Sequence, residues 1–278
     1  MKFSLIMATV GRTEEPGRFL ESLASQTWRD FELIAVDQNS DDRLRAILEQ
    51  FRIGFPIIHV TSKRGLSRAR NLGLKHIGGG IVAFPDDDCR YPPDLLSRVH
   101  SWLDRHPDYT GISGRSVDRN GNSTVGSFEK KPGDITRINI WRRTTSIALF
   151  LRMDATTEGL SFDPSLGAGA QTPWGSGEDI DFPLQALERG AKIYYDPALG
   201  VLHPVTTAHY NREAFKRAFS YGAGMGRVMK KYRYPFWFRA RTLIRPLGGT
   251  ALSLLSLRTA KAWYHLTLFR GRVRGLRG

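Results

Sequence analysis

The first hundred residues alternate between two hydrophobic periods, and this alternation limits the chain to one class of fold. Short apolar runs with the length of buried strands occupy residues 3–9, 31–36, 57–60 and 81–84. Apolar residues at helical spacing follow these runs, at residues 19–23, 44–51, 66–77 and 95–103. Strands that alternate with helices form a mostly parallel sheet with helices on both faces. The sequence therefore predicts an α/β fold of the nucleotide-binding type.

The remainder of the chain has a weaker pattern, from which we predict a continuation of the domain and a separate extension. Residues 111–177 are rich in glycine and polar side chains. Further strands are predicted at residues 138–141, 146–151, 192–195 and 201–203, and helices at 179–190 and 212–232. We place one domain at residues 1–210 and a basic, aromatic-rich helical extension at residues 211–278.

The composition is that of a globular protein in a reducing compartment. Hydrophobic residues make up 41% of the 278 residues and charged residues 24%, which excludes a disordered chain. The single cysteine, Cys89, permits no intrachain disulfide, and the cytoplasm fits best. We find no stretch of about 18 uncharged apolar residues, and interpret the N-terminal apolar run as a core strand instead of a secretory signal.

The positive charge is concentrated near the C-terminus. The net charge is +14, yet residues 201–278 hold 16 Lys and Arg with one acid, Glu213, a net of +15. Residues 1–200 hold the other 25 bases and 26 acids, a net of −1. Such an asymmetry indicates an electrostatic docking surface for anionic lipid or nucleic acid.

Polar side chains follow three of the predicted strands. Thr9 ends the first, Asp37 ends the second, and Asp86, Asp87 and Asp88 follow the fourth in "FPDDDC". Ligands of parallel sheets bind at the carboxyl ends of the strands, so we expect these side chains to converge. Consecutive carboxylates repel one another and favour a hard cation such as Mg²⁺ or Mn²⁺, which bridges phosphates. The alternative is an acidic loop that caps the next helix.

Two further positions carry candidate chemistry. Glu178 and Asp179 begin a helix in "WGSGEDIDF", where the helix dipole stabilises acids and where a general base can also lie. His203, in "VLHP", ends a strand and is a candidate ligand, although a lone histidine is more often structural. The "YGAGMG" run at residues 221–226 lies in a helical stretch and follows no strand, so we reject a dinucleotide-binding loop.

The order of these motifs resembles the family 2 glycosyltransferases, which are inverting enzymes of the GT-A fold that include many bacterial exopolysaccharide and cell-surface glycan transferases. The resemblance rests on Thr9, Asp37, "GLSRARNLGL", "FPDDDC" and "GEDIDFPLQALERGAKIYYDPALGVLHP", and covers roughly residues 1–210. It implies a nucleotide-binding half at about 1–110 and an acceptor-binding half at about 111–210. The implied donor is a nucleoside-diphosphate sugar, with UDP as the default and GDP or dTDP left open.

The resemblance implies nucleotide contacts for the first group of residues. Thr9 matches a turn beneath the nucleotide, Asp37 an aspartate that contacts the base, and Arg70 an arginine near the base or the diphosphate. Asp87 or Asp86 matches the aspartate that contacts the ribose. The chain departs from the family pattern at three positions: Gln38 replaces a second acid, Cys89 stands where an aspartate is frequent, and Ala8 replaces a common proline.

The resemblance implies a metal and a base for the second group. Asp88 matches the metal-binding aspartate, and His203 matches a histidine that ligates the metal in some members. Asp179 matches the catalytic base, with Glu178 beside it facing the acceptor. One base and no protein nucleophile imply a single displacement, which inverts the anomeric centre. The implied cofactor is Mn²⁺ or Mg²⁺.

The extension interleaves aromatic residues and leucines with Arg and Lys, as do helices that lie on anionic membranes. We therefore expect a peripheral position on the inner face of the cell membrane, which suits a lipid-linked or other glycan acceptor. An ordinary basic surface over a helical core is the alternative.

Three other functions remain open. The charge alone is compatible with nucleic-acid binding, but the sequence holds no recognition motif and the excess lies outside the α/β region, which disfavours it. A sugar-nucleotide nucleotidyltransferase shares a related sheet, but "TVGRTEEPGR" is a poor match to its phosphate loop. An inactive relative is the third.

Overall fold

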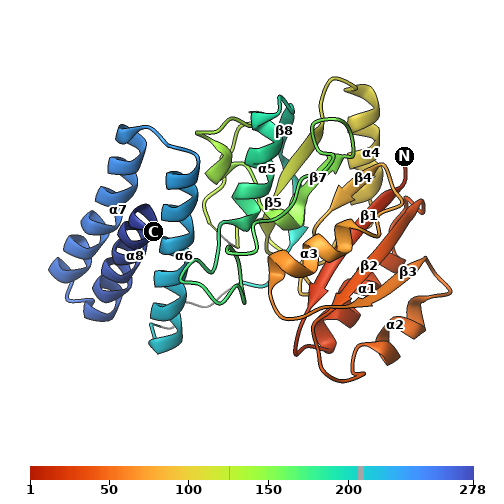
Figure 1. Ribbon diagram of the computed structural model, residues 1–278, viewed down its shortest axis with the longest axis horizontal. Helices are drawn as coiled ribbons and strands as arrows, with labels where there is room; N and C mark the ends of the chain where they lie inside the picture. Colours follow the sequence, from red (N-terminus) through yellow and green to blue (C-terminus); the bar gives the residue numbers. More distant parts are fainter. Residues whose placement is uncertain (125, 206–209) are drawn as a thin grey trace. The chain divides into compact units, whose positions relative to one another are not determined.

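The computed structural model describes residues 1–124, 126–205 and 210–278, and within them eight strands form one mixed sheet (Figure 1). The strand order is β3-β2-β1-β4-β7-β5-β8-β6. β3, β2, β1 and β4 run parallel, whereas β7 is antiparallel to both β4 and β5. The strands are β1 (Phe3–Thr9), β2 (Phe31–Asp37), β3 (Ile57–Thr61), β4 (Ile81–Ala83), β5 (Gly111–Val117), β6 (Gly133–Asp134), β7 (Leu149–Arg152) and β8 (Ile193–Leu202). The predicted mostly parallel α/β sheet is confirmed.

Helices cover both faces of the sheet, and alternate side chains of β1 contact the helices on opposite faces. Leu5 and the other odd-numbered apolar residues of β1 share one buried cluster with Phe19 of α1 and Leu96 of α4. On the opposite face Ile6 meets α3 at Gly73, where a Cβ would collide with the Ile6 side chain. The helices are α1 (Glu14–Ala24), α2 (Arg45–Phe51), α3 (Leu66–Leu74), α4 (Leu95–Arg105) and α5 (Glu178–Glu188). Each fully buried Leu, Ile or Phe here contributes roughly 1.5–3 kcal/mol to folding.

Two predicted details in the second half of the domain are wrong. The runs at 192–195 and 201–203 belong to one strand, β8, which crosses Pro197 through a register shift against β5 between Ser113 and Arg115. The run at 138–141 contributes to a 3₁₀ turn, Ile140–Arg142, instead of a strand. Short apolar runs report burial, and burial alone does not distinguish a strand from a tight turn.

The chain divides into two compact units. The first comprises Met1–Arg64, Arg68–Ser161 and Phe182–Thr206 and contains the sheet. The second comprises Gly65–Ser67, Phe162–Asp181 and Thr207–Gly278. It contains α6 (Arg212–Lys231), α7 (Phe236–Leu255) and α8 (Thr259–Arg277), so the predicted basic helix at 212–232 is confirmed. Within the described ranges, no helix has both the length and the apolar character that a membrane crossing requires.

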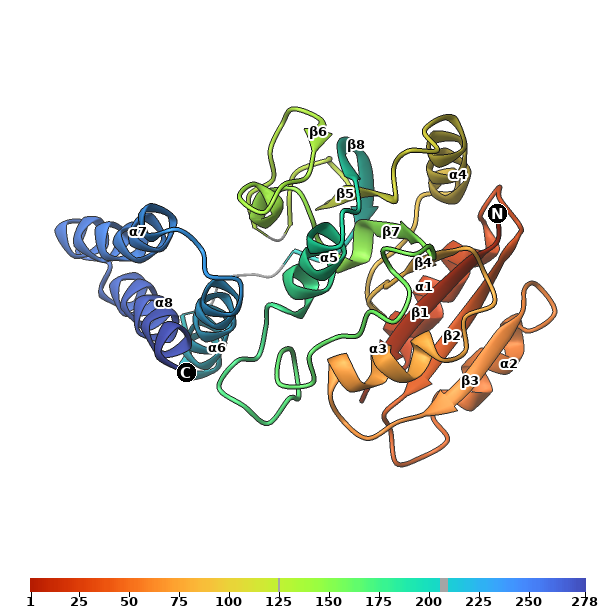
Figure 2. The same ribbon diagram turned by 45° about the horizontal axis from the view of Figure 1, so that its top comes forward.

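Helices α6 and α8 lie side by side (Figure 2), and glycines bring their backbones into contact. Gly222 and Gly226 on α6 face Gly271 and Gly275 on α8, and a Cβ at any of the four would collide with main-chain atoms of the other helix. Residues four apart lie on one side of a helix, so each pair forms a flat strip. The "YGAGMG" glycines therefore serve helix packing, which agrees with the rejection of a dinucleotide loop.

Candidate active site

The ends of β1, β2 and β4 meet at one edge of the sheet. Thr9 and Asp37 are paired in register, and Ala8 forms a parallel bridge with Asp86. Neighbouring parallel strands end at the same edge, so three segments far apart in sequence place their polar residues side by side. The structure therefore brings together the strand-end residues that the sequence analysis singled out.

Asp87 lies at the buried centre of this edge. The Thr9 hydroxyl donates a 2.6 Å hydrogen bond to Asp87 Oδ2, and Arg12 Nη1 donates to Asp87 Oδ1 at 2.6 Å. The same Arg12 nitrogen donates to Asp88 Oδ2 at 2.7 Å. Burial raises the pKa of Asp87 to about 6, against the opposing effects of Thr9 and Arg12. Arg12 is thus the resident positive charge between two carboxylates.

Asp86, Asp88 and His203 form a potential metal site. Each offers one ligand atom, and these atoms all lie within 4.8 Å of one another. His203 reaches the carboxylates because Leu202 and Arg90 exchange backbone hydrogen bonds of 3.0 and 2.8 Å, which ties the end of β8 to the segment after Asp88. Two carboxylates and an imidazole are donors that Mn²⁺ and related divalent ions accept.

The tautomer of His203 indicates that a cation fits between these groups. His203 Nδ1 lies 2.9 Å from the Pro204 carbonyl oxygen, which only accepts, so Nδ1 carries the proton. In the neutral ring Nε2 then presents a lone pair to Asp88 Oδ1, 3.4 Å away. Two acceptors that face each other require a proton or a metal ion between them, and a backbone partner on the distal nitrogen is typical of metal-ligating histidines.

Arg70 is a buried hydrogen-bond donor to Asp86. Its side chain is 1% exposed, and Nη2 donates to Asp86 Oδ1 at 3.0 Å and to Ser146 Oγ at 3.1 Å. The guanidinium carbon also lies 5.9 Å from the centre of the Phe84 ring. A buried Arg with these partners fixes the orientation of the Asp86 carboxylate.

Asp37 is buried and already has partners on both carboxylate oxygens. Oδ1 accepts from the backbone and side-chain nitrogens of Asn39, each at 2.8 Å, and Oδ2 lies 3.2 Å from His59 Nε2. Asn39 Oδ1 in turn accepts from the Gly11 backbone at 2.6 Å. Oδ1 thus accepts two hydrogen bonds, whereas Oδ2 has one partner and can accept a second donor.

Three polar residues of this edge were missed by sequence reasoning: Arg12, Asn39 and His59. Arg12 and Asn39 lie two or three residues beyond the ends of β1 and β2, where their position alone was a usable signal. His59 lies within β3. It reaches Asp37 because β2 and β3 pair with Ala35 opposite His59, and the sequence does not show this register.

Glu178 and Asp179 begin α5, as expected, in the second unit. Asp179 is partly exposed, while Glu178 is buried and packs against Gly167, whose φ of 96° favours glycine. Asp181, two residues later, is fully buried and forms a 2.6 Å ion pair with Lys231 on α6. The expectation that Asp179 is the catalytic base and that Glu178 faces the acceptor stays a prediction.

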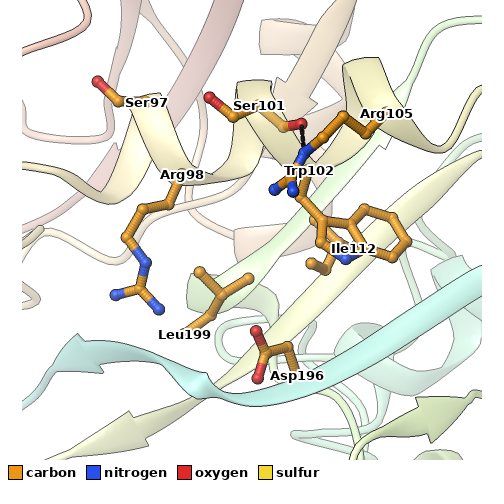
Figure 3. Close-up of a pocket in the computed structure, with 8 residues that line it drawn as sticks. All are labelled: Ser97, Arg98, Ser101, Trp102, Arg105, Ile112, Asp196 and Leu199. Atoms are coloured by element: carbon orange, nitrogen blue, oxygen red, sulfur yellow. Dashed lines mark hydrogen bonds between the residues drawn. The ribbon is translucent and has the colours of Figure 1, made fainter.

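A separate hollow of about 280 Å³ lies between α4 and β8 in the first unit (Figure 3). Its two cations already bond to backbone oxygens: Arg98 donates to Ala198 at 3.0 Å and Arg105 to Ser101 at 3.0 Å. The hollow is smaller than most ligand sites, and none of the residues predicted from the sequence lines it. The remaining lining residues are Ser97, Trp102, Ile112, Asp196 and Leu199. We do not assign it to the donor.

Comparison with known proteins decides the family. The model of the family described as "Glycosyl transferase family 2" matches residues 4–157, more than half of the chain. The chain belongs to glycosyl transferase family 2. The resemblance seen in the sequence motifs is therefore confirmed, and the matched region contains the whole of the acidic strand edge except His203.

Relatives of this family 2 glycosyltransferase include glycosyltransferase AglE of Haloferax volcanii, 24% identical over 272 residues, which cover 91% of this chain and 79% of AglE. The poly(ribitol-phosphate) β-N-acetylglucosaminyltransferase TarS of Staphylococcus aureus is 27% identical over 150 residues, 50% of this chain and 25% of TarS. Both are named as glycosyltransferases, as the family assignment requires.

Solved structures confirm the GT-A-like fold. Residues 1–349 of TarS with bound UDP superpose with a TM-score of 0.61 at 20% identity, covering 99% of this chain and 91% of that one. The mannosyltransferase PcManGT of Pyrobaculum calidifontis, in complex with GDP-Man and Mn²⁺, gives 0.67 at 16% identity, covering 99% and 87%. At these identities the likeness concerns the fold.

Proposed function

We propose that this glycosyltransferase moves a sugar from a nucleoside-diphosphate sugar to an acceptor hydroxyl with inversion, in polysaccharide or cell-surface glycan synthesis. The proposal rests on one observation: ligand atoms of Asp86, Asp88 and His203 gather within 4.8 Å at the edge where β1 and β2 also end. The complexes of PcManGT with GDP-Man and Mn²⁺ and of TarS with UDP support this choice of ligand.

The acidic edge supplies the site for the leaving group. Asp88, with Asp86 and His203, would hold Mn²⁺ or Mg²⁺, which stabilises negative charge on a departing diphosphate. Arg70 keeps Asp86 in position through its 3.0 Å bond. Arg12 is the neighbouring cation; it is 42% exposed and paired with Asp87 and Asp88, so it would exchange one of these ion pairs to contact a phosphate.

The nucleotide binds in the half at about residues 1–110. Thr9 lies in the turn beneath the nucleotide, Asp37 contacts the base, and Arg70 lies near the base or the diphosphate. Asp87 or Asp86 contacts the ribose. UDP is the donor nucleotide that we favour, with GDP and dTDP as alternatives. The acceptor, a glycan or lipid-linked sugar, binds in the half at about residues 111–210.

Asp179 acts as the general base in this proposal, and Glu178 faces the acceptor beside it. Asp179 takes the proton from the acceptor hydroxyl while that oxygen bonds to the anomeric carbon. The bond from the anomeric carbon to the diphosphate oxygen breaks on the opposite face, so the configuration inverts. General base assistance of this kind is worth about 10²–10⁴-fold in rate.

Thermal-shift measurements with UDP, GDP and dTDP, each with and without Mn²⁺, test the donor and the metal together. One nucleotide should raise the melting temperature only when Mn²⁺ is present, and Asp88→Asn should abolish that increase. Asp104→Asn, an exposed acid on α4, is the matched control and should behave as wild type. An Mn²⁺-dependent increase that survives in Asp88→Asn would refute the metal assignment.

Transfer assays test the base and the reaction class. Asp179→Asn should keep the nucleotide-dependent increase in melting temperature and lose about 10²-fold or more of transfer. Near wild-type turnover in this variant would overturn the assignment of the base. Release of free nucleoside diphosphate identifies a glycosyltransferase, whereas exchange with pyrophosphate would identify a nucleotidyltransferase.

A further inference from the structure

Helix α7 has its apolar side chains on the wrong side for a core helix. The three residues that it buries are Thr242, Pro246 and Ser253. Its large apolar residues are exposed instead, among them Ile244 at 65% and Leu255 at 83%. A helix in a soluble bundle normally shows the reverse arrangement.

Four exposed apolar residues lie along one side of α7 and a fifth lies in the turn after it, whereas Phe236, Leu247 and Leu254 are exposed on the adjoining side. Trp237, Ile244 and Leu255 are separated by nearly whole numbers of helical turns and therefore share one face of α7. Leu252, 68% exposed, lies beside Leu255 on that face, and Leu257, 89% exposed, continues the strip into the turn before α8. We call these five residues the α7 strip.

Positive charge borders the α7 strip on the same helix and turn. Arg241 lies on the face of Trp237 and Ile244, Arg245 lies next to that face, and Arg258 follows Leu257; all three are exposed. The sequence from residue 214 to residue 278 contains no acid, so nothing in this part of the chain neutralises them. An apolar strip flanked by arginines is the arrangement of helices that lie in a membrane interface.

We propose that the α7 strip docks the protein on an anionic lipid surface, with α7 parallel to the membrane plane. Trp237, Ile244, Leu252, Leu255 and Leu257 enter the boundary between headgroups and acyl chains, and the arginines bind headgroup phosphates. Each base near an anionic bilayer contributes about 1 kcal/mol to attraction. This inference does not depend on the donor or the base proposed above.

The chemistry of the strip favours lipid over the two other possible occupants. A second copy of the chain would bring the same net charge of +15 in residues 201–278 against this one, which opposes self-association. A nucleic acid would satisfy the arginines but leave Ile244, Leu252 and Leu255 in water, because aliphatic side chains do not stack on bases. An anionic bilayer is the partner that satisfies both the charge and the apolar area.

Vesicle flotation of the full chain tests the proposal. Wild type should float with vesicles that contain phosphatidylglycerol in phosphatidylcholine. It should float less with phosphatidylcholine alone, and less in 1 M salt, where the Debye length falls to about 3 Å and charges are strongly screened. The triple variant Ile244→Gln, Leu252→Gln, Leu255→Gln should lose roughly 100-fold or more in partitioning. These side chains are exposed, so the variant should fold, and its unchanged melting temperature verifies that.

Ile53→Gln is the matched control, because Ile53 is 99% exposed and lies in the first unit. It should float as wild type does. Absence of wild-type flotation with phosphatidylglycerol vesicles, or equal flotation of wild type and the triple variant, would overturn the proposal. Light scattering that shows a wild-type dimer and a monomeric triple variant, without flotation of either, would overturn it in favour of self-association.

Discussion

Replacement of Asp87 by asparagine is expected to stabilise the folded protein at neutral pH. The pKa of Asp87 is raised from 3.8 to about 6, mainly because the carboxyl is buried. That difference costs the folded state about 3 kcal/mol at pH 7, since one pKa unit corresponds to about 1.4 kcal/mol. The value already includes the favourable effects of Thr9 and Arg12 on the ionised form. Asparagine removes the ionisation and keeps the shape.

The hydrogen bonds of Asp87 survive the substitution in large part. Arg12 can still donate to the amide oxygen and remains paired with Asp88 at 2.7 Å. The Thr9 hydroxyl can reverse its role and accept from the new amide nitrogen. An amide is an imperfect copy of a protonated acid, so we expect a gain of about 1–3 kcal/mol at pH 7, below or equal to the full ionisation cost.

The pH dependence gives the sign of this effect. Below about pH 3.8 the carboxyl is protonated in both states, and the two proteins should differ little. Between about 3.8 and 6 the unfolded chain releases the proton while the folded wild type retains it, so wild-type stability falls as pH rises. The advantage of Asp87→Asn should therefore appear across this window and be complete above it.

Melting temperatures of both proteins from pH 3.5 to pH 8, without nucleotide or metal, provide the assay. At pH 7.5 the variant should melt several degrees higher, since about 1 kcal/mol corresponds to roughly 2–4 °C in a protein of this size. A variant that melts lower than wild type at pH 7.5, or a difference that does not change between pH 4 and pH 7, would refute the reasoning. Loss of nucleotide binding alongside the gain would indicate that stability is given up for function here.

Two further predictions concern the second unit. Lys231→Met should destabilise the protein by about 2–4 kcal/mol, because fully buried Asp181 loses its cation at 2.6 Å and retains the neutral Tyr232 hydroxyl at 3.0 Å; the lower end reflects the 35% exposure of Lys231. Melting curves check this, and rescue by a second substitution, Asp181→Asn, would show that the uncompensated charge of Asp181 is the cause. Gly275→Ala should cost about 1–3 kcal/mol by forcing α8 from α6, whereas Gly248→Ala, with open space around it, should stabilise α7 by up to about 1 kcal/mol. Equal effects of the two alanines on urea midpoints would contradict the packing argument.

The strands that carry the acidic edge were predictable because each is buried on both faces. β2 is buried at every residue, so its apolar run stands out in the sequence and Asp37 marks its end. β8 was not predictable as one strand, because Pro197 and a register shift interrupt its pattern. A break in periodicity looks the same whether the strand ends or bulges.

The pairings within the site depended on tertiary structure. Arg12 reaches Asp87 and Asp88 across more than seventy residues, and no local spacing reports such a contact. The sequence also predicted a helical extension at residues 211–278 without showing which side of each helix faces inward. Periodicity identifies an apolar face but not its environment, and on α7 that face is exposed while Thr242 and Ser253 are buried.

Glycines join α6 to α8, so the residues that hold the two helices together are different from the residues on their outward sides. Their contact is made by main-chain atoms at Gly222, Gly226, Gly271 and Gly275, so the association demands little of any larger side chain. Residues on the outward sides can then vary in charge and bulk with little penalty to folding. A designer can recharge this helix pair, or evolution can retarget it to another surface, while its architecture stays intact.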